Sequence, residues 1–256
     1  MRAEAPAATR RQIMVVAAAR QIRDTEIVFV GMRLPLLGFA VAKATHAPRA
    51  VGLFENGVIR DTPPAGALIT MGDPPNIAGA VMCTTLLDVM SHLERGRVDV
   101  GFLGGAQVDR FGNLNTTWVE EGGRRVRLPG SGGAADIAAL SRRTVVIMRH
   151  ELRRFPERVG YLTSPGYGSG GAWRREAGLP RGGPARVITS LAVMGFDPAS
   201  GEMVLESVHP GVTIGEVRAH TGWDLRAAAR PDTTAVPTAE ELAVLRRFDP
   251  DGAWTG

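Results

Sequence analysis

The segment Ala50-Val51-Gly52-Leu53-Phe54-Glu55-Asn56-Gly57-Val58-Ile59 carries the strongest structural signal in the chain. A short apolar run leads to Glu55, and the Asn56-Gly57 pair then favours a tight turn before the apolar pattern resumes. We therefore predict a buried strand that ends at a turn, with the Glu55 carboxylate at its end. A carboxylate so close to the core must be paired, neutralised or used in chemistry. The alternative is a solvated carboxylate that caps the turn.

Strand and helix patterns alternate on both sides of this segment. Helices are expected at 10–23 (capped by Thr9), 36–45, 84–96 and 134–141, and strands at 26–31, 51–54, 98–103 and 144–148, with a weaker strand at 68–71. This alternation predicts a parallel sheet with helices on its faces, in which ligands bind at the carboxyl ends of the strands. Glu55, Gly104-Gly105 and the loop at Gly130 follow such strand ends, so we expect them to converge.

The pattern changes in the last third of the chain. A hairpin of 187–196 and 203–208 is expected across residues 197–201, followed by helices at 213–220 and 238–248. The predicted fold class is α/β, an open, mostly parallel sheet flanked by helices, with a C-terminal hairpin and terminal helices. Residues 1–7 are expected to form a flexible tail and 8–256 a single domain. The Gly-, Pro- and Arg-rich residues 164–184 are expected to form a long surface loop.

Composition excludes several classes of function. The 256 residues are 44% hydrophobic and 22% charged, with a net charge of +4 that rests on arginine, because Lys43 is the only lysine. The arginines are interleaved with acidic residues and there are only two tyrosines, which argues against nucleic-acid binding. No apolar run approaches the length of a membrane span, and the charged N-terminus does not resemble a signal peptide. We therefore expect a cytoplasmic protein without a membrane partner.

The sequence also argues against metal and serine-hydrolase chemistry. There is no G-x-S-x-G motif, and no H-x-x-x-H pair among the five scattered histidines, His46, His92, His150, His209 and His220. Cys83 is the only cysteine and follows the apolar residues Ala80-Val81-Met82. We expect it to be a buried, inert thiol.

Two glycine-rich segments differ in their sequence context. Gly130-Ser131-Gly132-Gly133 opens a predicted helix, so its backbone N–H groups either face an anion or developing oxyanion, or simply form a helix entry. Residues 166–171 match G-x-G-x-x-G, but no strand directly precedes them. We interpret the second segment as a flexible loop without a cofactor role.

Residues 104–115 combine a strand exit, Gly104-Gly105, with a Gly-Asn turn and a second asparagine, Asn115. Amide side chains there can hold a carboxylate or a thioester carbonyl; for Asn113 we favour a left-handed turn conformation instead. The arginines between 142 and 158 are expected to lie mostly on a solvated or interface surface, with a minority meeting the phosphates of a nucleotide-bearing substrate.

Taken together, these motifs resemble the class I coenzyme A transferase family, and within it the B subunit of glutaconate CoA-transferase. Glu55-Asn56-Gly57 matches the family's Glu-Asn-Gly motif. The resemblance extends over most of the chain, through residues 34–38, 104–109, 112–115, 130–134, 153–155 and 163–166. Phe54 departs from the serine that many members carry before the glutamate, which favours the glutaconate-like branch and leaves the acyl group open.

The resemblance implies a covalent mechanism. Glu55 is the nucleophile that attacks an acyl-CoA thioester and becomes a glutamyl-CoA thioester, so coenzyme A is substrate and covalent intermediate, with no permanently bound cofactor or metal. Backbone amides near Gly132 and Gly133 stabilise the oxyanion, and Asn115 orients Glu55. Substrate-binding positions are expected at Asn56, Gly57, Gly104, Gly105, Gln107 and Ser131. The implied partner is a separate A subunit, in a heterotetramer or larger assembly that acts on a dicarboxylic or related acyl group.

Two alternatives remain open at this point. Relatives on this scaffold include a hydrolase that opens a cyclic oxo-acyl-CoA in steroid breakdown, and a decarboxylase in which cysteine replaces the glutamate. Glu55 argues against the decarboxylase but not against the hydrolase. A non-catalytic ligand sensor is the other alternative, because fold alone does not determine function.

Overall fold

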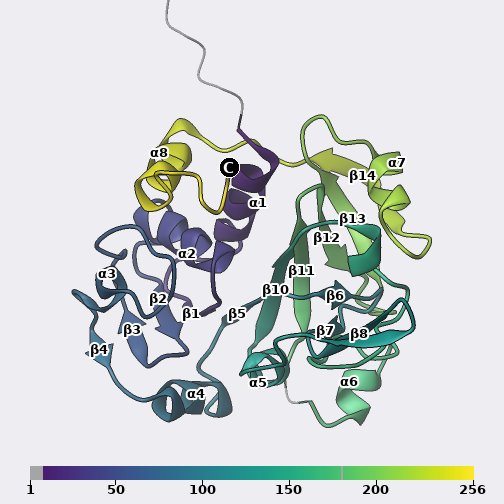
Figure 1. Ribbon diagram of the computed structural model, residues 1–256, viewed down its shortest axis with the longest axis horizontal. Coiled ribbons are helices and arrows are strands. Elements are labelled where there is room, and N and C mark those ends of the chain that lie inside the picture. The colour runs from purple at the N-terminus through teal and green to yellow at the C-terminus, as the bar shows by residue number, and fades with distance from the viewer. Residues whose placement is uncertain (1–7, 180) are drawn as a thin grey trace, which may run out of the picture.

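The computed structural model describes residues 8–179 and 181–256, and its centre is a ten-stranded mixed sheet (Figure 1). The strand order is β14-β13-β12-β11-β10-β5-β1-β2-β3-β4. These strands are β1 Ile27–Val30, β2 Val51–Phe54, β3 Val58–Arg60, β4 Met82–Cys83, β5 Val100–Leu103, β10 Arg143–Met148, β11 Pro184–Thr189, β12 Ala192–Phe196, β13 Met203–Val208 and β14 Arg226–Thr233. The expected tail, residues 1–7, lies outside the described residues.

Five neighbouring strands, β11, β10, β5, β1 and β2, run parallel, which confirms the predicted sheet type. After β1 the chain forms β2 on one side, and later returns to form β5 on the other side of β1. The carboxyl ends of these strands therefore share one edge of the sheet. The reversal of strand order at β1 is the place where open α/β sheets hold their ligands.

Helices cover both faces of the sheet (Figure 1). Their bounds are α1 Arg10–Ala19, α2 Leu34–Ala44, α3 Pro74–Ile77, α4 Leu86–Glu94, α5 Ala134–Leu140, α6 Trp173–Glu176, α7 Ile214–Ala219 and α8 Ala239–Phe248, with a short 3₁₀ helix, η1, at Leu152–Arg154. Two separate strand pairs are β6 Gln107–Val108 with β7 Leu114–Asn115, and β8 Trp118–Glu121 with β9 Arg124–Arg127.

Alternating side chains of the central strands form two cores. In β1, Val28 and Val30 pack in the core under α1, α2 and α8, whereas Phe29 packs in the core under α4, α5 and α7. A strand buried on both faces needs apolar residues at successive positions, which is why these strands appear in the sequence as continuous apolar runs.

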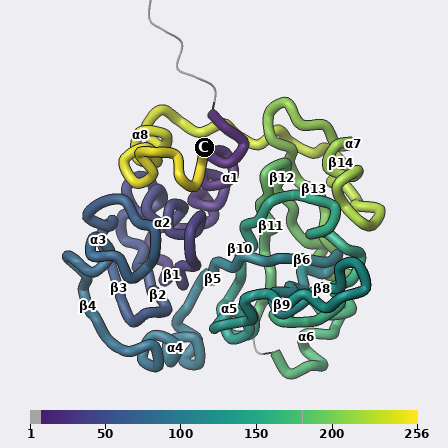
Figure 2. The backbone as a smooth tube through the Cα atoms, viewed as in Figure 1, coloured from purple at the N-terminus to yellow at the C-terminus, as the bar shows by residue number. Residues whose placement is uncertain are grey.

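The two ends of the described chain lie side by side at α1 (Figure 2). The Thr9 hydroxyl donates to the Thr255 carbonyl oxygen over 2.8 Å, and Arg11 donates to the Gly256 carbonyl oxygen over 2.7 Å. Thr9 also forms a capping box with Gln12, and Thr238 forms one with Glu241. The predicted starts of both helices are confirmed.

Two local predictions are wrong. Residues 68–71 form bends and a turn instead of a strand, because the Asp73 carboxylate accepts hydrogen bonds from the backbone N–H groups of Ile69 and Thr70. Cys83 is exposed, because β4 is the last strand at one edge of the sheet. The expected first hairpin strand, 187–196, is divided between β11 and β12; the hairpin of β12 and β13 is present.

The segment 164–184 is anchored to the domain by Arg174 on α6. Its buried guanidinium donates to the carbonyl oxygens of Pro165, Gly166 and Arg181 within the segment, and to that of Ala138 on α5. Four neutral acceptors surround this cation, and burial lowers its pKa. The loop therefore helps to fix the position of α5.

Candidate active site

Glu55 lies in a three-residue connection between the antiparallel strands β2 and β3. The Gly57 N–H donates to the Phe54 carbonyl oxygen over 2.9 Å and closes the turn. Gly57 has φ +99°, and a Cβ atom added there would lie 2.0 Å from the Thr84 carbonyl oxygen. Only glycine fits this position, so the turn that presents Glu55 depends on it.

A hydrogen-bond network connects the Glu55 turn to the loop between β3 and β4. The Asn56 side chain donates to the Met71 carbonyl oxygen over 3.0 Å, and the buried Asn76 donates to the same oxygen over 2.7 Å. Arg60, only 1% exposed, connects β3 to this loop through the backbone carbonyl oxygens of Thr62, Pro63, Asn76 and Ala78. Burial lowers the pKa of this guanidinium. Arg60 lies opposite Gly52, at the end of the β2–β3 pair away from the turn, and its neutral acceptors fix the loop that Asn76 and Asn56 join to the turn through the Met71 carbonyl oxygen.

The half-buried Glu55 carboxylate meets the glycine loop that opens α5. The Gly133 N–H donates to Oε1 of Glu55 over 3.1 Å. A Cβ atom at Gly133 would lie 3.0 Å from that oxygen and 3.1 Å from Cε of Met90, and one at Gly132 would lie 3.7 Å from the oxygen. The structure thus brings together Glu55, Gly132 and Gly133 as expected, and glycine permits the close approach. Met90 of α4 was not identified from the sequence.

Three other predicted positions, Gly104, Gly105 and Ser131, lie in the loops that follow β5 and precede α5. Gly104 and Gly105 follow β5, at the carboxyl edge that β2 shares. Ser131 lies in the glycine loop, and its carbonyl oxygen accepts from the Ala134 N–H. Among the described residues, no hydrogen bond joins either glycine or Ser131 to Glu55.

Asn115 is fully buried, and its hydrogen bonds are local. Its amide donates to Gln107 over 2.9 Å and to the Trp118 carbonyl oxygen over 2.8 Å, and its oxygen accepts from the Thr117 N–H. Within residues 8–179 and 181–256, none of its hydrogen bonds reaches Glu55. The side chain ties β6 and β7 to the start of β8.

Asn113 does not adopt the left-handed conformation that we favoured. The positive φ in this turn lies at Gly112, and the Asn113 side chain instead bonds to Asp109 and to the backbone of Gly166 and Gly168. Burial raises the pKa of Asp109, although backbone N–H groups donate to it. These residues fix the loop that begins at residue 164.

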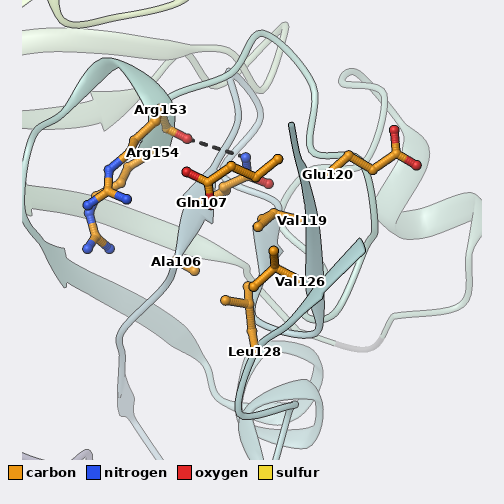
Figure 3. Close-up of a pocket in the computed structure, with 9 residues that line it drawn as sticks. Ala106, Gln107, Val119, Glu120, Val126, Leu128, Arg153 and Arg154 are labelled. Carbon is orange, nitrogen blue, oxygen red and sulfur yellow. Dashed lines mark hydrogen bonds between the residues drawn. The ribbon is translucent and has the colours of Figure 1, made fainter. Parts of the chain in front are cut away.

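The hairpin β8–β9 is a prominent feature that was not predicted. Its strands pair from Trp118↔Arg127 to Glu121↔Arg124, around Gly122-Gly123. A Gly-Gly pair between alternating residues is a recognised hairpin signal and was available in the sequence. One face of the hairpin lines a cavity of about 240 Å³ that includes Gln107 (Figure 3).

The arginines between 142 and 158 are mostly paired with acids. Arg143 bonds to Glu26 at the start of β1 and Arg142 to Asp99 before β5, on the edge of the sheet opposite to Glu55. Arg153 and Arg154 share Glu151. The expectation that some of this group meet a substrate's phosphates gains no support from these pairings.

Two buried histidines contact Thr189 at the carboxyl end of β11. His150 contacts the hydroxyls of Thr189 and Thr221, each over 3.1 Å, and stacks on Phe155 with 4.0 Å between ring centroids. Burial lowers the pKa of His150 to about 3 and also lowers that of His209. Both rings are therefore neutral at pH 7.

Residues 8–179 and 181–256 provide neither a metal-binding cluster nor a membrane-spanning helix. This part of the chain contains no cluster of three or more histidine, cysteine, aspartate or glutamate residues arranged to hold a metal ion. It also contains no helix with the length and apolar character needed to cross a membrane.

Comparison with known proteins gives consistent results. A family model described as coenzyme A transferase matches residues 11–220. The chain is 40% identical over 241 residues to the B subunit of 3-oxoadipate CoA-transferase from Pseudomonas knackmussii, covering 93% of this chain and 92% of that protein. It is 28% identical over 251 residues to the cholesterol ring-cleaving hydrolase IpdB subunit of Mycobacterium tuberculosis, covering 93% of each.

A third relative is similar in both sequence and structure. The B subunit of glutaconate CoA-transferase from Acidaminococcus fermentans is 32% identical over 253 residues, covering 96% of this chain and 94% of that protein. The crystal structure of glutaconate coenzyme A-transferase from that organism matches with a TM-score of 0.88 at 31% identity, over 97% of both chains. On the family model and these relatives, the chain belongs to the coenzyme A transferase family.

Proposed function

We propose that this chain is the B subunit of a heteromeric CoA-transferase and that Glu55 is its nucleophile. The observation that carries the proposal is the hydrogen bond from the Gly133 N–H to Oε1 of Glu55. It places a carboxylate and a backbone donor at the carboxyl edge of a parallel sheet, where ligands bind. The same donor that orients the carboxylate can stabilise an oxyanion formed at the adjacent carbon.

The reaction follows from this arrangement in balanced steps. The Glu55 carboxylate attacks the thioester carbonyl carbon, and the C–S bond breaks to give a mixed anhydride and CoA thiolate. The thiolate attacks the glutamyl carbonyl carbon and releases the first acid, leaving a glutamyl-CoA thioester. An acceptor carboxylate then reverses both steps, so the free energy of the thioester is retained if water is excluded.

An A subunit would provide the missing cover over the half-exposed site. Beside the Glu55 turn, α3, β4 and α4 expose five large apolar side chains, Ile77, Val81, Met82, Leu86 and Leu87, at 45–76%. This surface is continuous with the turn, because Thr84 donates to the Gly57 carbonyl oxygen over 2.8 Å. Exposed apolar groups of this size mark protein interfaces. We propose that the A subunit packs against this surface and completes the acyl pocket.

The acyl group is proposed to be a dicarboxylic acid or a related one. The relatives named for 3-oxoadipate and glutaconate act, by their names, on dicarboxylates. Such a substrate and coenzyme A would place the reaction in the cytoplasm. The relative named as a hydrolase keeps the second candidate function open, in which water takes the place of the acceptor.

A trapping experiment tests the role of Glu55. The complex of this chain with its A subunit is mixed with dicarboxylyl-CoA donors, quenched in acid and digested with trypsin. We expect the peptide Ala50–Arg60 to gain the mass of coenzyme A less one water. A turning-over enzyme whose Ala50–Arg60 peptide never carries this mass would contradict the proposal.

Acceptor dependence separates transferase from hydrolase. We expect free CoA to appear slowly without an acceptor acid, and the new acyl-CoA to form rapidly when a dicarboxylate is added. Rapid release of free CoA in the absence of acceptor would favour the hydrolase instead.

A further inference from the structure

The two faces of the β8–β9 hairpin have different chemistry. The cross-strand pair Val119↔Val126 and the following Leu128 line the cavity beside Gln107, as their side chains in Figure 3 show. Because side chains alternate along a strand, Trp118, Arg125 and Arg127 lie on the opposite face. The first face also carries Glu121 and Arg124. The second face combines an aromatic ring and two arginines with one acid, Glu120, which lies opposite Arg125 across the strands.

The second face borders a separate cavity of about 360 Å³, lined by Thr117, Trp118, Arg125, Arg127 and Tyr161. The Trp118 and Tyr161 rings lie 5.8 Å apart at an angle of 51°. The Arg125 guanidinium stacks over Trp118 at 4.1 Å. Stacking uses the face of a guanidinium and leaves the N–H groups at its edge available as donors.

Within the described residues Arg125 and Arg127 form no ion pair, although Glu120 lies opposite Arg125 in the strand register. Neither forms an ion pair or a side-chain hydrogen bond there, in contrast to Arg142, Arg143, Arg153 and Arg154. Two unpaired guanidiniums beside two aromatic rings are suited to a ligand that joins phosphates to a flat ring system.

The cavity is connected to the candidate active site by a short stretch of chain. An atom of the Arg127 guanidinium lies 3.8 Å from the position that a Cβ atom would take at Gly130. Gly130 opens the glycine loop whose Gly133 N–H donates to Glu55. The six residues from Arg127 to Gly133 span at most about 20 Å. An extended pantetheine arm can cover a distance of that order.

We propose that Trp118, Arg125, Arg127 and Tyr161 form the subsite for the 3′-phosphorylated ADP of coenzyme A. The inference rests on the proposed function, since it assumes that an acyl-CoA reaches Glu55. The guanidiniums bind the phosphate groups, and adenine packs against the exposed part of the Tyr161 and Trp118 rings. The pantetheine arm then runs past the glycine loop to the carboxylate.

Substrate truncation tests this assignment. The double variant Arg125→Gln/Arg127→Gln is compared with wild type in complex with the A subunit, using one acyl group as its CoA thioester and as its pantetheine thioester. Each lost guanidinium–phosphate contact is expected to cost about tenfold. We therefore expect KM for the CoA thioester to rise about a hundredfold, with kcat little changed and the pantetheine thioester unaffected.

Arg124→Gln is the matched control, because Arg124 lies on the same strand but on the opposite face. We expect it to leave both KM values unchanged. An unchanged KM for the CoA thioester in the double variant would overturn the assignment. Failure of that variant to assemble with the A subunit would also overturn it, by identifying the face that carries Arg125 and Arg127 as a protein interface.

Direct binding keeps this inference separate from the proposed function. Calorimetric titration of the wild-type complex with CoA and with dephospho-CoA requires no turnover. We expect the double variant to weaken CoA binding more than dephospho-CoA binding, even if no acyl donor is found. Equal affinities of both ligands for wild type and variant would refute the subsite whatever the reaction proves to be.

Discussion

The Glu55 turn and the β8–β9 hairpin are both parts of the proposed acyl-CoA site, but the surrounding structure holds them very differently. The turn is fixed by a glycine that fits closely against Thr84 and by the hydrogen bond from the Asn56 side chain to the Met71 carbonyl oxygen. The hairpin presents Arg125 and Arg127 to solvent, and among the described residues neither forms an ion pair. Covalent chemistry needs a carboxylate held to a fraction of an ångström, whereas binding a long flexible thioester tolerates an adaptable surface.

The largest effect should follow removal of the carboxylate at the turn. Glu55→Ala eliminates the nucleophile, so kcat is expected to fall by about 10⁴-fold or more. Steady-state assay of the complex measures the loss. Glu121→Ala, which removes an exposed carboxylate from the hairpin, should retain near wild-type kcat. An equal loss of kcat in the two variants would contradict the assignment of Glu55 as the nucleophile.

Arg60, the buried cation at the end of β3, should contribute strongly to stability. Arg60→Met leaves several buried carbonyl oxygens without donors, and the free energy of unfolding is expected to fall by about 3 kcal/mol. The midpoint of urea denaturation reports the change. Arg124→Met, at an exposed hairpin position, should shift the midpoint little. A small effect at Arg60 would mean that water replaces the guanidinium freely.

A single methyl group should disturb the contact between Glu55 and the glycine loop. In Gly133→Ala the Cβ atom would sit 3.0 Å from Oε1 of Glu55, so the carboxylate must move. The shift needed is a few tenths of an ångström, so we expect kcat to drop about tenfold, less than the loss that a full 1 Å displacement causes. Gly160→Ala is the control, because a methyl group there meets nothing within 4 Å. Unimpaired kcat in Gly133→Ala would show that the observed contact is dispensable.

Acid should destabilise the fold through the buried side chain of His150. His150 has a pKa of about 3 when folded and about 6.5 when unfolded, so its stabilising contribution is present above pH 6.5 and is lost as pH falls towards 3. Between pH 7 and 5 this amounts to about 2 kcal/mol.

Urea denaturation at pH 7 and pH 5 measures the difference. His150→Gln should unfold with a weaker pH dependence than wild type, because glutamine does not titrate. The same pH dependence in both proteins would assign the acid sensitivity to other groups.

The sequence predicts the parallel sheet well because β1, β2, β5 and β10 are buried on both faces. Short, continuous apolar runs of this kind are typical of strands in a parallel sheet that helices cover on both faces. Glu55 could be predicted because it follows such a strand, whereas the Gly132-Gly133 pair could be recognised because it opens a helix; the structure shows that the exposed hairpin strand β9, not a central strand, precedes it. Neither the 3.1 Å contact of Glu55 with the Gly133 N–H nor Met90 beside it could be predicted, because both depend on how α4 and α5 pack.

The failures have physical causes. Residues 68–71 have the apolar content of a strand, but the Asp73 side chain competes for their backbone N–H groups. Cys83 has apolar neighbours in the sequence, yet these lie at a sheet edge that the described chain leaves open. Sequence context reports apolarity, not the presence of a covering element.

The exposed position of Cys83 has a practical consequence. It is the only cysteine in the chain, and it pairs with Val58, one residue after the Glu-Asn-Gly turn. A maleimide fluorophore can therefore be attached at one defined place without engineering. Its emission would follow the arrival of the second subunit in real time.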